Sequence, residues 1–77
     1  MKQKKLLIGK YLKRLRLEAG LSQSSMARQG KTNQPEISRT EANIIEPTYR
    51  LLVAYARGLK MSTAALVAQL PPDVRKR

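Results

Sequence analysis

Helix start and stop signals divide this sequence into short segments, and that division limits what the chain can fold into. Four segments have apolar residues at helical spacing, and each follows a residue that favours a helix N-cap. These N-cap residues are Ser22, Asn33, Thr48 and Ser62. An earlier segment with the same spacing ends at Gly20. No stretch alternates well enough to be a strand. We expect an all-α fold of five short helices over residues 6–19, 23–29, 34–42, 48–59 and 63–70.

The third segment has the most complete start signal. Asn33 stands at the N-cap, Pro35 falls in the first turn, and Glu36 is placed to bond back to the cap. Asn43 tolerates the left-handed conformation that often ends a helix. Only residues 31–33 separate this helix from the one before it, so we expect a tight turn between the two.

Length and residue usage exclude most enzyme classes. The 77 residues allow one domain, which we place at residues 6–70 between a basic arm (1–5) and a basic tail (71–77). The chain has no Cys and no His, so thiol nucleophiles, zinc-thiolate sites and imidazole bases are absent. No glycine-rich phosphate loop or carboxylate metal cluster is visible either. We expect neither an enzyme nor a cofactor or metal.

The net charge of +11, from 16 basic and 5 acidic residues, predicts a polyanionic partner. Residues 1–31 carry +8, residues 47–77 carry +5 and residues 32–46 carry −2. Nucleic acid is the first candidate, and the three tyrosines do not form the stacking platform typical of RNA binding. No stretch is long and apolar enough for a membrane span or a signal peptide, so we expect a cytoplasmic protein without a membrane partner.

Two helices of eight or nine residues joined by a three-residue turn are the parts of a helix-turn-helix. The residues that carry a more specific resemblance are Ile8-Gly9, Leu12, Arg16, Gly20-Leu21-Ser22-Gln23, Met26-Ala27, Gln34, Ile37-Ser38-Arg39, Glu41, Pro47, Leu52, Ala56, Leu59 and Met61-Ser62. With them the chain resembles the phage repressor/Cro-type (XRE-like) helix-turn-helix family from about Leu6 to Leu70, without insertion or deletion. The resemblance implies a five-helix repressor-like bundle whose third helix enters the DNA major groove.

The resemblance also implies roles for individual residues. Its base-contacting positions correspond to Gln34, Pro35, Ser38 and Arg39, where Gln34 suits adenine and Arg39 suits guanine. Its phosphate contacts correspond to Ser22 and Gln23 at the start of the second helix and to Asn33, and Lys13 would add attraction. The matching Arg16 and Glu41 would form a partly buried ion pair between the first and third helices.

Each assignment has a plainer alternative. Gln23 and Gln34 are also ordinary polar residues for the first turn of a helix. Arg39 could pair with Glu36 three residues back, which contributes only a few tenths of a kcal/mol. Arg16 and Glu41 could be unrelated surface charges. The basic stripe of the first helix, Lys10, Lys13 and Arg14, could be a solvated face.

Four residues depart from the family pattern. Lys31 replaces the usual turn glycine, and we expect the neighbouring Gly30 to absorb the bend. Thr40 replaces an aliphatic residue, and its hydroxyl is expected to bond the carbonyl four residues back. Pro35 offers a base only apolar contact, and Glu46 would repel phosphate unless it points away.

The sequence therefore predicts a sequence-specific transcriptional regulator, a repressor or controller, that binds double-stranded DNA. One head contacts few bases, so we expect a homodimer on a pseudo-palindrome with half-sites about 34 Å apart. Val67, Leu70 and Val74 are the candidates for the dimer surface, whereas Leu66 is expected to close the core. The alternative is an antitoxin that binds a toxin and represses its own operon, which the absence of a long extra segment disfavours.

Overall fold

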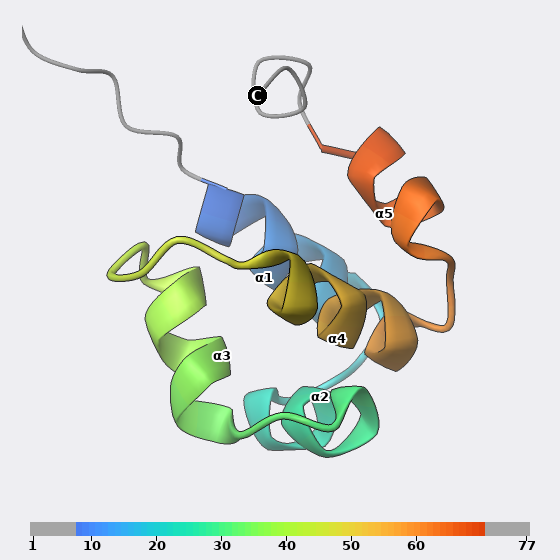
Figure 1. Cartoon of the computed structure of the whole chain (residues 1–77). Coiled ribbons are helices and arrows are strands. Elements are labelled where there is room, and N and C mark those ends of the chain that lie inside the picture. Colours follow the sequence, from blue (N-terminus) through green and yellow to red (C-terminus); the bar gives the residue numbers. More distant parts are fainter. Residues whose placement is uncertain (1–7, 71–77) are drawn as a thin grey trace, which may run out of the picture.

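Five α-helices and no strands make up residues 8–70, the part of the chain that the computed structural model describes (Figure 1). The helices are α1 (Ile8–Glu18), α2 (Gln23–Gly30), α3 (Gln34–Glu41), α4 (Tyr49–Leu59) and α5 (Thr63–Ala68). The predicted all-α class is confirmed, and the end of α1 and both bounds of α2 to α5 lie within two residues of their predicted positions. The predicted start of the first helix, at residue 6, lies outside the described residues. The predicted basic arm and tail lie outside the described residues. No helix within residues 8–70 is long and apolar enough to cross a bilayer.

The predicted N-caps all act as caps. The side-chain oxygens of Ser22, Asn33, Thr48 and Ser62 each accept a hydrogen bond from the backbone N–H three residues later, at 2.9–3.2 Å. The predicted return bond from Glu36 to the Asn33 cap is wrong. The Glu36 carboxylate instead accepts bonds from the Thr32 hydroxyl and from Arg50 at the start of α4, and these two donors outcompete the cap.

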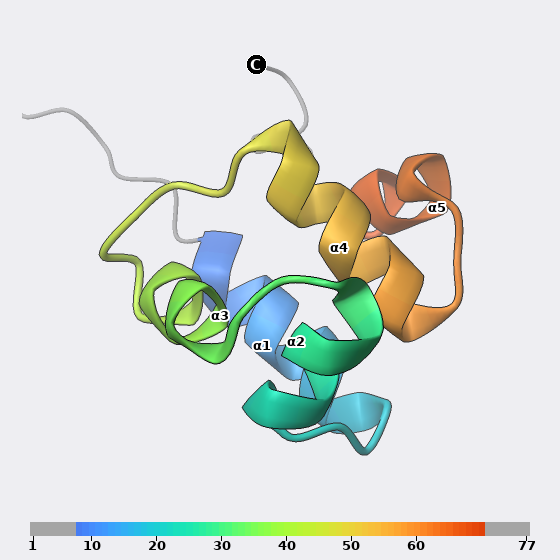
Figure 2. The same ribbon diagram turned by 60° about the horizontal axis from the view of Figure 1, so that its bottom comes forward.

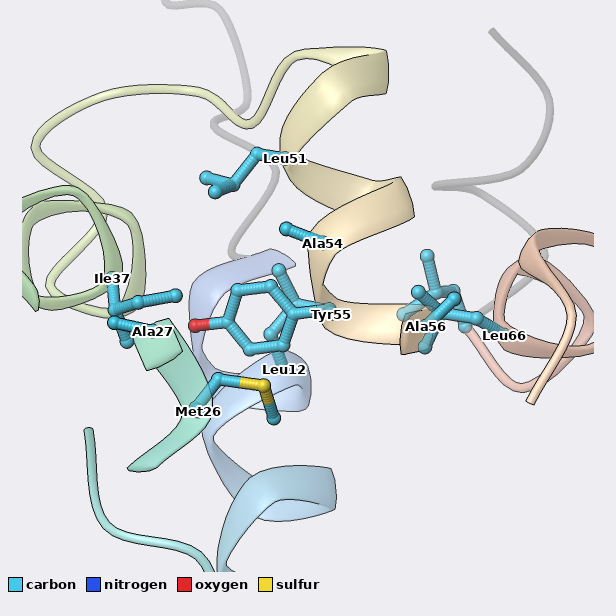
Figure 3. Close-up of a cluster of buried hydrophobic side chains, with 10 residues drawn as sticks. Leu12, Met26, Ala27, Ile37, Leu51, Ala54, Tyr55, Ala56 and Leu66 are labelled. Atoms are coloured by element: carbon cyan, nitrogen blue, oxygen red, sulfur yellow. The ribbon is translucent and has the colours of Figure 1, made fainter. Parts of the chain in front are cut away.

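Helix α4 lies at the centre of the fold. It packs against α1, α2 and α5, while α3 packs against α1 and α2. Helices α3 and α5 lie at opposite ends of the molecule in both views (Figures 1 and 2). The core cluster has the ring of Tyr55 in its middle (Figure 3), and its fully buried side chains include Leu12, Met26, Ile37 and Leu66. Three helices surround α4, so α4 is buried on a wider face than the spacing of its apolar residues predicts. The buried apolar residues of this face are Leu51, Ala54, Tyr55 and Ala56.

The bend between α2 and α3 is made by Lys31. Its φ of 64° and ψ of 45° place it in the left-handed region, and Gly30 remains the last residue of α2. The expectation that Gly30 absorbs the bend is therefore wrong. Gly30 has a different reason to be glycine, because a Cβ there would lie 2.5 Å from the carbonyl oxygen of Ala54 in α4. The missing side chain lets α2 and α4 approach closely.

The end of α3 is fixed against the start of α1. Asn43 adopts the predicted left-handed conformation, with a φ of 62°. Its Oδ1 accepts a hydrogen bond of 3.0 Å from the backbone N–H of Gly9. A Cβ on Gly9 would collide with the carbonyl oxygen of Thr40 and would lie 2.9 Å from that of Glu41. These contacts hold α3 at a defined position on the scaffold.

Thr40→Val is expected to raise the free energy of unfolding by about 1 kcal/mol. Thr40 is fully buried, and its hydroxyl has no hydrogen-bond partner within the described part of the chain. The expected bond to the carbonyl four residues back is therefore wrong. Valine keeps the shape and removes the unpaired hydroxyl, and urea unfolding would measure the gain. Thr63→Val on α5 serves as control, and a loss of stability in Thr40→Val would contradict the prediction.

Candidate nucleic-acid interface

Helices α2 and α3 pack against each other and are joined by residues 31–33 (Figure 2). The four residues expected to contact bases lie on one side of α3, since positions four apart share a helix face. Gln34, Pro35 and Arg39 are exposed and Ser38 is half-buried. Ile37, Thr40 and Glu41 are buried on the scaffold side. The helix thus presents a polar face outward.

The Arg39 side chain makes no hydrogen bond or ion pair with any residue that the structure describes. Its possible partner Glu36 is engaged elsewhere, with Thr32 and with Arg50 Nη2, which lies 3.3 Å from Glu36 Oε2. The hydrogen bond from Thr32 and the nearby arginines lower the pKa of Glu36. Arg39 therefore keeps its five N–H donors available at the surface.

Arg16 and Glu41 form a bidentate ion pair between α1 and α3. Arg16 Nε lies 2.7 Å from Glu41 Oε2, and Arg16 Nη2 lies 2.8 Å from Glu41 Oε1. The two residues are only 5% and 7% exposed. Arg16 Nη1 also donates to the carbonyl of Leu21 just before α2, at 2.7 Å. One buried arginine thus links α1 to both helices of the turn motif.

The Glu41 carboxylate accepts two further hydrogen bonds. Tyr55 Oη donates to Oε2 at 2.7 Å, and Gln23 Nε2 donates to Oε1 at 3.2 Å. Burial by itself would raise the pKa of Glu41, but the hydrogen bonds from Arg16, Tyr55 and Gln23 outweigh burial and lower it. Burial and the bond to Glu41 raise the pKa of Tyr55, which therefore remains a neutral donor. The sequence did not identify Tyr55 as part of this site, since its only signal was a core-like position.

The side chains of Gln23 and Gln34 meet between α2 and α3. Gln34 Nε2 donates to Gln23 Oε1 at 2.6 Å. The residue expected to contact phosphate and the residue expected to contact a base are thus bonded to each other. Through Gln23, this pair is continuous with the buried Glu41.

The start of α2 retains free donors. The Ser22 hydroxyl accepts from Ser25 N–H at 3.0 Å and serves as the cap. The N–H groups of Gln23 and Ser24 have no acceptor among residues 8–70, as is usual for the first turn of a helix. Such N–H groups favour an anion. Asn33 uses its oxygen to cap α3, which leaves its amide NH₂ at the turn.

The remaining predicted residues lie on α1 and on or after α5. Lys13 is exposed on α1, where its neighbours Lys10 and Arg14 lie over the ring of Tyr11, 5.3 Å and 5.6 Å from its centroid. Leu66 is fully buried in the core. Leu70, expected on a dimer surface, is only 3% exposed and belongs to the hydrophobic core. Val67 is half-buried on α5, and Val74 lies outside the described residues.

Comparison with known proteins gave one family. The model of the helix-turn-helix domain family matches residues 7–70, which is most of the chain and contains the whole site described above. Neither the curated proteins nor the solved structures gave a match. The chain therefore belongs to the helix-turn-helix domain family of DNA-binding proteins.

Proposed function

We propose that the protein is a sequence-specific transcriptional regulator, a repressor or controller, that places α3 in the DNA major groove. The outward face of α3 supports this proposal most directly, because it carries Gln34 and Arg39, and Arg39 has no ion-pair partner within residues 8–70. Both carboxylates of α3 are engaged elsewhere: Glu36 bonds Thr32 and Arg50, and Glu41 is buried with Arg16. The face toward DNA therefore carries positive charge although its segment is acidic overall.

Side chains of α3 and N–H groups around it are of the kinds that bind bases and phosphates in a major groove. A major groove about 12 Å wide admits one helix and distinguishes all four base pairs. In the proposal Arg39 binds guanine, Gln34 binds adenine, Pro35 touches a thymine methyl group and Ser38 bonds a base edge. The N–H groups at the start of α2, the second side-chain N–H of Gln23 and the Asn33 amide hold phosphates. Lys13 adds sequence-independent attraction.

We further propose that the regulator acts on the nucleoid as a homodimer. A single DNA-binding domain contacts too few base pairs to select one site among the many non-specific sites of a genome. Two heads related by a two-fold axis would bind half-sites about 34 Å apart. Val67, half-buried on α5, and Val74 are the candidates for the contact between protomers. In this arrangement the two protomers would meet at the end of the molecule opposite α3, where α5 lies (Figure 1).

Arg39→Ala is expected to relax the preference at one base pair per half-site and to weaken binding there by about 1–3 kcal/mol. The measurement is selection of bound sites from random duplex DNA, followed by titration of the best site and a scrambled one over a range of salt. Lys13→Ala is the matched control, since loss of a general attraction weakens both duplexes alike. Equal affinity of the wild type for the selected and scrambled duplexes would overturn the proposed function.

A further inference from the structure

We propose that the exposed side of α4, together with the end of α2, binds the phosphate backbone of a second DNA duplex, so that the protein bridges two duplexes. Four exposed basic residues form this bridging surface: Lys31, Arg50, Arg57 and Lys60. The inference rests on the proposed function, because the first duplex is the one that α3 binds. It adds a sequence-independent contact on a different side of the molecule.

The basic residues of α4 follow one side of the helix. Arg50 and Arg57 are seven residues apart, which is about two turns, and Lys60 follows directly after the helix ends. All three are exposed, and α4 contains no acidic residue. From Arg50 to Lys60 the chain rises by about 15 Å along the helix axis. That length corresponds to about four base-pair steps of a duplex.

Close packing of α2 on α4 adds Lys31 to this side. Because Gly30 has no side chain, the end of α2 approaches the carbonyl oxygen of Ala54, which would lie 2.5 Å from a Cβ on Gly30. Arg57 Nη1 donates to the Gly30 carbonyl at 2.9 Å, directly beside Lys31. Neither Lys31 nor Arg57 forms an ion pair with any residue in the range 8–70. Their positive charges are therefore available to an anion.

Both lysines of the bridging surface stand where glycine would be less strained. Lys31 and Lys60 end α2 and α4 in the left-handed conformation, with φ of 64° and 60°. Glycine is the usual residue at such positions, because it has no Cβ. A cation does interact favourably with the C-terminal end of a helix dipole, so stability has to be measured separately from binding. Two strained lysines beside unpaired arginine N–H groups point to a ligand.

The composition of the bridging surface favours nucleic acid over an acidic protein. The centres of protein–protein interfaces are rich in aromatic residues and poor in lysine. The large apolar residues exposed within residues 8–70 are Leu17, Ile44, Ile45 and Tyr49. Only Tyr49 belongs to α4, and its hydroxyl is a group that bonds phosphate. Lysine and arginine are the other common phosphate ligands, so the surface fits a DNA backbone.

The bridging surface leads away from the outward face of α3. It begins at Arg50, whose Nη2 lies 3.3 Å from Oε2 of Glu36 on α3. It then follows α4 toward α5, and α5 lies at the opposite end of the molecule from α3 (Figure 1). Arg57 and Lys60 are therefore available to a duplex other than the one that α3 binds.

The test is capture of a second duplex. The protein is bound to an immobilised duplex that carries its selected site, and a labelled duplex of scrambled sequence is added over a range of salt. Lys31→Gly combined with Lys60→Gly is expected to weaken capture about tenfold or more and to reduce the slope of log affinity against log salt by about 2. Affinity for the selected duplex is expected to stay within about twofold. Urea unfolding should show no loss of stability, since glycine suits both positions.

Lys10→Gln combined with Arg14→Gln is the matched control, because it removes the same charge from the exposed side of α1. It is expected to capture the second duplex as the wild type does. Equal losses in the two double variants, or full capture by the glycine variant, would overturn the inference alone. So would polyglutamate that displaces the second duplex better than free DNA of equal charge, which would assign the surface to an acidic protein. A wild type without preference for the selected duplex would instead overturn the proposed function.

Discussion

Replacing Arg16 by alanine is expected to lower the free energy of unfolding by about 3–5 kcal/mol. The substitution removes both bonds of the ion pair and leaves the Glu41 carboxylate buried without its counter-ion. It also frees the carbonyl of Leu21, which Arg16 Nη1 bonds. A domain of this size has only a few kcal/mol of net stability, so much of the population should be unfolded at room temperature. Urea unfolding followed by circular dichroism measures the change.

The controls distinguish a buried pair from a surface pair. Lys13→Ala, on the exposed side of the same helix, should change stability by less than about 0.5 kcal/mol. Glu41→Ala should cost as much as Arg16→Ala, because it leaves the guanidinium unpaired. The double substitution Arg16→Met with Glu41→Leu should recover part of the loss, since no buried charge remains. A wild-type melting temperature in Arg16→Ala would show that the ion pair contributes nothing.

Features determined within a few residues were predictable from the sequence. Each N-cap depends on one short side chain and on the backbone N–H three residues later, as at Ser22 and Thr48. The helix bounds follow from such caps and from the residues after each helix, so they were predicted closely. The all-α class followed from the same signals. The resemblance to the repressor family added what local signals lack, namely which helices face each other.

Features that depend on several competing partners were not predictable. Glu36 has the spacing of a capping residue, but Thr32 and Arg50 bind it instead. Tyr55 has the pattern of a core residue, and only the tertiary fold brings its hydroxyl on α4 to Glu41 on α3. The burial of Leu51 follows from the number of helices around α4, which no single segment specifies.

The distribution of charge shows why the acidic segment can still face DNA. Residues 32–46 carry −2 in the sequence, but charge counts do not say which way a side chain points. Glu41 points into the core and Glu36 points toward Arg50. What is left on the outward face of α3 is one arginine among uncharged side chains. Selectivity in the proposal thus depends on a few polar atoms, and the basic flanks supply attraction to any duplex.

Gly30→Ala is expected to lower the free energy of unfolding by about 3 kcal/mol, although alanine favours helices over glycine by about 1 kcal/mol. The added Cβ would lie 2.5 Å from the carbonyl oxygen of Ala54 and 3.0 Å from its carbonyl carbon. Both are backbone atoms of α4, which cannot rotate away. The Gly30 carbonyl also accepts a bond of 2.9 Å from Arg57 Nη1, so a shift of α2 would strain a second contact. Urea unfolding, as for Arg16→Ala, measures the loss.

Lys31→Gly tests the same turn, and its effect on the free energy of unfolding is expected to be opposite to that of Gly30→Ala. Lys31 is the residue with positive φ at this turn, and glycine adopts that conformation without the steric cost, so we expect a gain of about 1 kcal/mol. The two substitutions together separate the two uses of glycine at a helix end. If Gly30 absorbed the bend, Gly30→Ala would be costly because of its backbone conformation and Lys31→Gly would stabilise nothing. A loss in the first variant with a gain in the second means that Gly30 is required for the close approach of α2 and α4, while the bend itself belongs to Lys31.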